Sequence, residues 1–192
     1  DLSIDLNGMA EAAKGAGLGF LCNPNNPTST FHSGLSVAAF IDDVRRSSPE
    51  TMIQVDEAYI DYSEDPIGGT AVPFALDDPN VFVTRTFSKA YGMAGLRLGY
   101  AIGRPETMQK IEAAWGLGSV NVLTAAAAIA SLNDPSHMER ERQENARVRE
   151  FVHSTFKGLG LGVPLSNTNF LFVGLDRPVG DFRDACLEHR VQ

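Results

Sequence analysis

The sequence predicts a three-layer α/β/α fold, with helices on both faces of a central sheet. Short apolar runs of strand length alternate with segments whose apolar residues recur at helical spacing. Polar motifs follow three of these runs, at the strand ends where α/β sheets gather ligands. We expect a large domain at about residues 1–140. Residues 141–192 would then complete a long connector helix and begin a smaller α+β domain.

The first five elements follow from periodicity and turn residues. Met9, Ala12, Ala13 and Ala16 recur at helical spacing within the first segment. Prolines and asparagines exclude regular structure from the third segment, and the fourth has one apolar side. We expect a helix at Leu6–Gly17, a strand at Leu18–Cys22, a turn at Asn23–Thr30, a helix at Ser36–Arg46 and a strand at Met52–Val55.

The later elements are predicted in the same way. We expect strands at Val81–Arg85, Leu98–Ile102 and Asn169–Val173, and helices at Pro73–Asp77, Pro105–Leu117, Asn121–Leu132, Ser136–Lys157 and Val179–His189. Proline at the first position and Glu106 in the first turn favour a helix start. Alanine on all sides of Asn121–Leu132 predicts tight burial between layers, whereas charge around Ser136–Lys157 predicts a solvated connector.

Composition excludes several classes of protein. A net charge of −8 over 192 residues argues against a nucleic-acid binder. The longest apolar run, Val120–Leu132, is too short to cross a bilayer, and the N-terminus has no secretory pattern. Cys22 and Cys186 lie far apart, which favours reduced thiols in a cytoplasmic protein. The four histidines have no partners at ligand spacing, so we predict no metal site.

Lys89 lies in the chemically richest stretch, Val81–Gly103. It is one of four lysines and follows a strand-like run among apolar and small neighbours. Partial desolvation there would make a neutral, nucleophilic amine available for Schiff-base chemistry. The hydroxyls of Thr86 and Ser88 and the guanidinium of Arg97 would suit a phosphate dianion. The alternative is an ordinary solvated loop lysine beside a surface arginine.

Two further motifs favour the functional interpretation. Cys22–Thr28 reads CNPNNPT, Val55–Tyr59 reads VDEAY, and Thr86–Lys89 reads TFSK, with Arg97 eight residues further on. In order and spacing these motifs resemble the fold type I, class I/II aminotransferases that depend on pyridoxal 5′-phosphate (PLP). The asparagine-rich form most resembles histidinol-phosphate aminotransferase and its close relatives. The resemblance implies the large PLP-binding domain of that family.

The resemblance also implies a role for each site residue. Lys89 would form the Schiff base and move the substrate proton, and Asp56 would pair with the pyridine nitrogen. The remaining roles are contacts to the phenolic oxygen by Tyr59 and Asn26, and to the phosphate by Thr86, Ser88 and Arg97. The purely structural alternatives are that Asp56 caps a turn at the strand end, that Tyr59 is a core residue and that Asn26 only forms a turn. Because Asn26, Asp56 and Lys89 each follow a strand, we expect them at one edge of the sheet.

The sequence also predicts the environment of three residues close to these motifs. Glu57 should point to the opposite side of the strand from Asp56. Arg85 is interpreted as a surface residue. Ser29 stands where the family usually has glycine, so it would be strained if the position requires positive φ.

The family implies an amino donor and a 2-oxo acid as substrates, the histidinol-phosphate class being favoured, and a homodimer. The alternatives are a PLP-dependent decarboxylase or an aromatic aminotransferase on the same fold, or a non-catalytic ligand-sensing module. Relatives are roughly twice as long, so we expect an interior piece of a longer chain. They carry a phosphate-binding glycine-rich turn, a ring-stacking aromatic and a substrate-binding arginine outside this stretch. We therefore expect weak PLP binding and poor transamination by these 192 residues alone.

Overall fold

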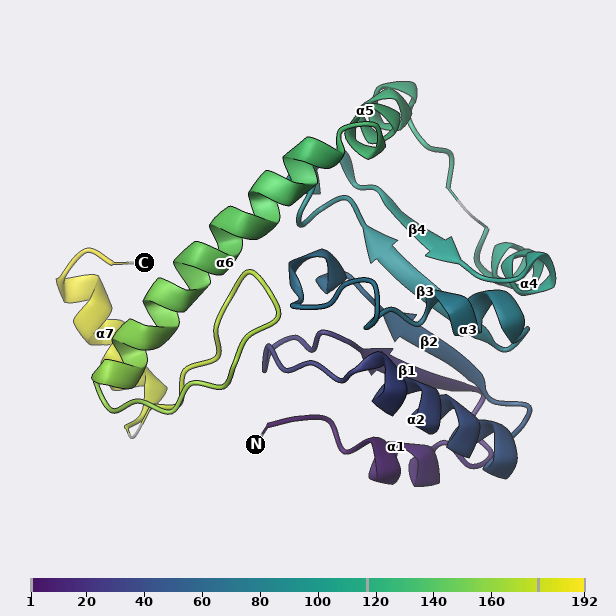
Figure 1. Cartoon of the computed structure of the whole chain (residues 1–192), viewed down its shortest axis with the longest axis horizontal. Coiled ribbons are helices and arrows are strands. Elements are labelled where there is room, and N and C mark those ends of the chain that lie inside the picture. Colours follow the sequence, from purple (N-terminus) through teal and green to yellow (C-terminus); the bar gives the residue numbers. More distant parts are fainter. Residues whose placement is uncertain (1, 117, 176, 192) are drawn as a thin grey trace.

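The structure of the chain is a computed structural model that describes residues 2–116, 118–175 and 177–191 (Figure 1). The strands are β1 (Leu18–Cys22), β2 (Met52–Asp56), β3 (Val81–Thr86) and β4 (Gly99–Ile102). The α-helices are α1 (Leu6–Ala12), α2 (Gly34–Ser47), α3 (Val72–Asp77), α4 (Pro105–Trp115), α5 (Val122–Leu132), α6 (Pro135–Gly158) and α7 (Val179–Glu188). Two short 3-10 helices, η1 (Ile60–Tyr62) and η2 (Ala94–Leu96), lie in the connections.

The four strands form one mixed sheet in the order β1-β2-β3-β4. The first three are parallel, and β4 runs antiparallel to β3. Cys22 pairs with Asp56, and Asp56 pairs with Thr84, so these residues form a row near the carboxyl ends of the strands. Thr86 pairs with Gly99, which brings the start of β4 to the same edge. The sheet therefore collects the polar motifs along one edge.

One face of the sheet carries the main hydrophobic core. Alternate residues of the strands point toward α1, α2 and α3, as the two-residue period of a strand requires. The fully buried strand residues are Leu21, Ile53, Val55, Val81 and Val83. They pack against the apolar side of α2, formed by Val37, Phe40, Ile41 and Val44. This core fixes the strands whose ends carry the polar residues.

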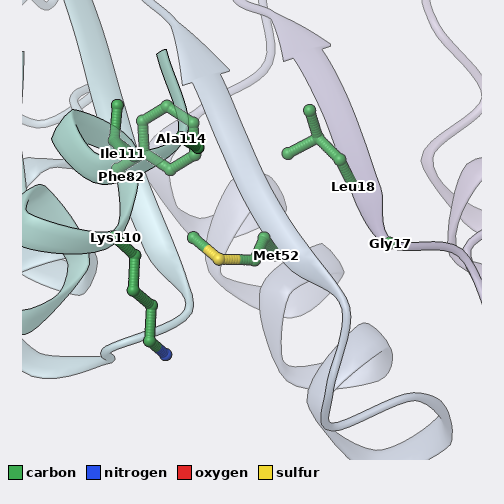
Figure 2. Close-up of a pocket in the computed structure, with 7 residues that line it drawn as sticks. All are labelled: Gly17, Leu18, Met52, Phe82, Lys110, Ile111 and Ala114. Carbon is green, nitrogen blue, oxygen red and sulfur yellow. The ribbon is translucent and has the colours of Figure 1, made fainter. Parts of the chain in front are cut away.

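The other face of the sheet is only partly covered. Helix α4 lies over its amino-terminal end and forms one wall of an open apolar pocket of about 270 Å³ (Figure 2). Gly17, Leu18, Met52, Phe82, Lys110, Ile111 and Ala114 line this pocket. Leu18 and Phe20 on β1 remain 44% and 52% exposed. The α/β architecture is as predicted, but the described helices cover the two faces unequally.

Most predicted elements are present, with shifted ends. The first helix stops at Ala12, before the predicted Gly17, and Gly15 just beyond it adopts a left-handed φ of 72°. The Thr51 hydroxyl lies 2.7 Å from the Ala16 carbonyl, to which it can donate. The last residue predicted for α4, Leu117, lies outside the described residues. Helix α6 has no buried residue, in agreement with a solvated helix.

Two predictions about the C-terminal part are wrong. Residues 169–173 form no strand, because the Phe170 carbonyl accepts hydrogen bonds from the hydroxyls of Ser166 and Thr168 and not from a neighbouring strand. An isolated bridge joins Gly162 to Gly174 nearby. Helix α5 is not tightly buried, since Val122 is 77% and Leu123 74% exposed. No described segment packs against that apolar side.

Within the described ranges, every helix is too short or too polar to cross a membrane. The same residues contain no group of three or more His, Cys, Asp or Glu side chains that could hold a metal ion.

Candidate active site

The loop after β1 is closed by Asn23, which is 1% exposed. Its Nδ2 donates to the carbonyl of His32 at 2.9 Å, and its Oδ1 accepts the backbone N–H of His32 at 2.8 Å. These two bonds tie the start of the loop to its end. Ser29 lies inside the loop with φ +62°, so the position does require the left-handed conformation. Asn26 is exposed and is therefore available at the sheet edge.

Asn26, Tyr59 and Lys89 come together from three segments of the chain. Asn26 Nδ2 donates to the Tyr59 hydroxyl at 3.3 Å. Lys89 Nζ lies over the Tyr59 ring, 5.2 Å from its centroid. The ring itself is 6% exposed and packs edge-on against Phe170, with the centroids 5.2 Å apart. A primary amine is thus held beside a phenol and a carboxamide.

Asp56 is the last residue of β2 and faces the open side of the sheet. Its Oδ1 accepts a hydrogen bond from Thr84 Oγ1 at 3.1 Å. Burial raises the pKa of the Asp56 carboxyl above its ordinary value, and the hydrogen bonds from Thr84 and the backbone of Ala58 act in the opposite direction. The site therefore holds a carboxylate in a partly desolvated position.

Glu57 points to the opposite side of the sheet, as the strand period predicts. Its side chain is 0% exposed and accepts two hydrogen bonds from Arg85, at 2.9 and 2.8 Å. Thr70 Oγ1 and the backbone N–H of Ala71 also donate to it. Arg85 is therefore not the surface residue that we expected, because it neutralises a buried carboxylate. This ion pair lies behind Asp56 and fastens β2 to β3.

The loop that carries Lys89 is held by backbone and hydroxyl contacts. Thr86 Oγ1 donates to the Leu98 carbonyl at 3.3 Å and accepts the backbone N–H of Ser88 at 3.0 Å. The backbone N–H of Phe87 also donates to Leu98, at 3.1 Å. Thr86 and Ser88 are thus adjacent, at the edge that carries Asp56 and Lys89.

Arg97 begins the return toward β4 in a left-handed conformation, with φ 54°. Its exposed guanidinium donates to the Ala94 carbonyl at 2.9 Å. No hydrogen bond joins Arg97 to Thr86 or Ser88, although Leu98 beside it contacts Thr86. The structure therefore brings two of the three predicted phosphate ligands together and leaves the third at the rim.

The C-terminal segment reaches the same edge. The backbone N–H of Asn167 donates to the Ser29 carbonyl at 2.9 Å, and its Oδ1 accepts the backbone N–H of Glu64 at 3.0 Å. Helix α6 runs past the side to which β1, β2 and β3 point (Figure 1). There its Glu141 Oε1 accepts a hydrogen bond from the Tyr62 hydroxyl at 3.1 Å. These contacts position Phe170 against Tyr59.

The donors and acceptors at this edge fit the functional groups of PLP. An amine beside a phenol and an amide suits an aldehyde next to a phenolic oxygen. A desolvated carboxylate suits a protonated pyridine nitrogen, and hydroxyls, backbone N–H groups and an exposed guanidinium suit a phosphate. In this structure the Thr86 hydroxyl donates its hydrogen to the Leu98 carbonyl and accepts the backbone N–H of Ser88. It therefore stabilises the turn around Ser88.

Sequence reasoning missed Gln54 and Thr84. Gln54 Nε2 donates to Thr84 Oγ1 at 3.1 Å, and Thr84 in turn contacts Asp56. The two-residue strand period places Gln54 with Asp56 and Thr84 with Thr86 on one face. That signal was present in the sequence, but the strand register that makes Thr84 a neighbour of Asp56 was not.

The model of the family "Aminotransferase class I and II" matches residues 1–191. A histidinol-phosphate aminotransferase from Symbiobacterium thermophilum is 42% identical over 190 residues, which cover 98% of this chain and 51% of that protein. An aromatic amino acid aminotransferase from Mycobacterium avium is 39% identical over 163 residues, which cover 85% of this chain and 45% of that protein. The chain thus spans about half the length of the relatives it matches.

A solved structure shares the fold. The histidinol-phosphate aminotransferase from Sinorhizobium meliloti, in complex with pyridoxal-5'-phosphate, superposes with a TM-score of 0.87 at 30% identity. The superposition covers 97% of this chain and 51% of that one.

Proposed function

This chain belongs to the aminotransferase class I and II family, and from that premise we propose that it forms the core of a PLP site in an amino-group-transferring enzyme. The observation that carries the proposal is the meeting of Asn26, Tyr59 and Lys89 at the edge of the sheet where Asp56 ends β2. The proposal is further supported by the solved relative that contains PLP.

Lys89 is the proposed catalytic residue. When bound, PLP supplies an electron-withdrawing ring that stabilises negative charge on the carbon from which a proton is removed. The Lys89 amine would anchor the cofactor and would hold the proton taken from the substrate α-carbon. The Tyr59 ring beneath the amine limits the directions in which it can move.

The other proposed ligands bind and orient the cofactor. Asp56 keeps a proton on the ring nitrogen by placing a negative charge beside it. Tyr59 and Asn26 would contact the phenolic oxygen, and the hydrogen bond from Asn26 to Tyr59 orients both side chains. Thr86, Ser88 and Arg97 are the proposed phosphate ligands. Arg97 would have to turn from the Ala94 carbonyl to contribute its charge, and the Thr86 hydroxyl would have to turn from the Leu98 carbonyl to donate to a phosphate.

The favoured substrates are an amino-alcohol phosphate of the histidinol-phosphate type and a 2-oxo acid. This choice is supported by the relative with 42% identity, and the aromatic aminotransferase alternative by the relative with 39%. The complete enzyme is proposed to be a cytoplasmic homodimer. Residues 1–140 would belong to its large domain and residues 141–192 to the connector and smaller domain.

The experiment is to titrate the 192-residue chain with PLP and record the absorbance of the bound cofactor. Histidinol phosphate or phenylalanine is added to the complete PLP-loaded enzyme, because the substrate-binding arginine is expected outside these 192 residues. The spectral change there reports on the amino-transfer half-reaction. We expect weak but saturable 1:1 binding of PLP by the 192-residue chain, and in the complete enzyme a larger change with histidinol phosphate. A larger change with phenylalanine would favour the aromatic alternative. Absence of saturable binding at millimolar PLP would contradict the proposed site.

A further inference from the structure

Three side chains form a directed hydrogen-bond chain on the open face of the sheet. Gln54 Nε2 donates to Thr84 Oγ1 at 3.1 Å, and Thr84 Oγ1 donates to Asp56 Oδ1 at 3.1 Å. Thr84 lies directly opposite Asp56 in the parallel pairing of β2 and β3. The chain therefore ends on the carboxylate that we assign to the cofactor ring.

The direction of these bonds follows from the chemistry of the groups. A threonine hydroxyl has one hydrogen to donate and two lone pairs that accept. Because the Gln54 amide donates to the hydroxyl, the hydroxyl hydrogen is free for Asp56. An ionised carboxylate only accepts hydrogen bonds, so this arrangement is complementary to charged Asp56. Donation from Gln54 also polarises the hydroxyl and strengthens its bond to the carboxylate.

Asp56 has no ion-pair partner among the residues that the structure describes. On the β1 side it faces Cys22, whose thiol pKa is raised mainly by burial and partly by the Asp56 charge. Burial raises the pKa of Asp56, and the Thr84 hydroxyl and the Ala58 backbone lower it. Two neutral donors thus counter the desolvation of this carboxylate.

We propose that Thr84, supported by Gln54, is a positioning residue that holds the Asp56 carboxylate ionised and oriented for the cofactor ring. The orientation toward the ring rests on the function proposed above. Core packing does not require a hydroxyl at position 84, because the strand face it shares with Phe82 is the one only partly covered by α4. A valine of nearly the same shape would fill the position but would not donate to Asp56.

The test compares Thr84→Val, Thr84→Ser and Thr107→Val with the wild-type chain. Thr84→Ser restores a hydroxyl at the same place. Thr107→Val is the matched control. Thr107 is 0% exposed, and its hydroxyl donates to the carbonyl of Pro79, which precedes the amino-terminal end of β3, away from Asp56. The first measurement is the pKa of the Asp56 carboxyl in the chain without added PLP, by carbon-13 NMR titration. The second is the dissociation constant of PLP.

We expect Thr84→Val to raise the pKa of Asp56 by about one pH unit, the effect of losing one hydrogen bond to a charged group. PLP binding near pH 7 should weaken several-fold. Thr84→Ser should stay close to wild type on both measurements, and Thr107→Val should leave the pKa of Asp56 unchanged. Gln54→Leu should raise that pKa by less than Thr84→Val.

The proposal is overturned if Thr84→Val leaves the pKa of Asp56 unchanged, or if Thr84→Ser behaves like Thr84→Val. It is also overturned if Thr107→Val shifts the pKa equally, which would indicate a general effect of stability. If the wild-type chain does not bind PLP but the pKa still rises in Thr84→Val, the cofactor assignment fails and the hydroxyl–carboxylate link stands. The two failures are therefore distinguishable.

Discussion

Asp56 illustrates how a single site residue opposes folding. Because burial raises its pKa in the folded chain, the unfolded chain loses its proton first as the pH rises. The ionised carboxylate therefore destabilises the fold fully above the folded pKa, and the penalty disappears below the ordinary value of 3.8. Asp56→Asn should raise the midpoint of guanidinium unfolding at pH 7, with no difference at pH 3.

The control for this prediction is Asp42→Asn, on the exposed side of α2. It should leave the midpoint nearly unchanged at both pH values. An Asp56→Asn chain that is no more stable than wild type at pH 7 would show that the hydrogen bonds from Thr84 and Ala58 fully compensate the burial of the charge.

Ser29 destabilises the folded chain in two ways. It adopts a left-handed backbone conformation, and its buried Oγ has no hydrogen-bond partner in the described part of the chain. Ser29→Gly removes both the strained backbone conformation and the unpartnered hydroxyl. This gain should outweigh the extra conformational entropy that glycine gives the unfolded chain, so the free energy of unfolding should rise by about 1 kcal/mol. We expect the melting temperature to rise by about 2–4 °C, measured by calorimetry.

Ser29→Ala separates the two causes, since it removes the hydroxyl and keeps the left-handed strain. Its rise in melting temperature should be smaller than that of Ser29→Gly. A lower melting temperature for Ser29→Gly would mean that the side chain has a stabilising contact.

The orientation and strain of single residues were predictable from sequence where they depend only on the local backbone conformation. The strand period correctly placed Glu57 on the side opposite Asp56, and the comparison with glycine correctly identified Ser29 as strained. Arg85 was misjudged because its partner, Glu57, belongs to another strand, and strand register is a tertiary property. The same limit hid Gln54 and Thr84.

At the level of elements, periodicity located helices and strands better than it described their surroundings. The alanine-rich composition of α5 predicted tight burial, and that prediction is wrong, because composition does not say whether another segment covers the helix. Residues 169–173 have strand-like side chains and no strand partner, because hydroxyls of the preceding residues take up the backbone carbonyl. Both errors concern neighbours and not local propensity.

Helix α6 is fastened to the site edge through Arg149. Its Nη1 donates to the Tyr62 carbonyl at 2.9 Å and to the Thr168 carbonyl at 3.2 Å. Arg149→Met keeps the apolar stem and removes both donors. We expect amide hydrogen exchange at Asn167, which donates to Ser29, to accelerate about tenfold.

Arg147→Met is the matched control on the same helix, because Arg147 is exposed and pairs with Glu144. It should leave exchange at Asn167 unchanged. Equal exchange in wild type and Arg149→Met would show that the loop, and not α6, holds this segment in place.

On the scale of the whole molecule, the site depends on one property of the sheet. The polar motifs were expected at a common edge because each follows a strand, and the parallel order of β1, β2 and β3 brings Asn26, Asp56 and Lys89 to that edge. The antiparallel β4 was not foreseen, yet it returns Leu98 to Thr86 at that edge, with Arg97 at the rim beside it. The chain spans about half of its relatives, and one sheet face is largely open.

The most direct test of the account is to identify which lysine reacts with PLP. The chain is incubated with PLP, reduced with borohydride, digested and analysed by mass spectrometry. Of the four lysines, Lys14, Lys89, Lys110 and Lys157, we predict that Lys89 carries the pyridoxyl group in clear excess over the others. Labelling spread evenly over all four, or concentrated on any lysine other than Lys89, would contradict the proposed site.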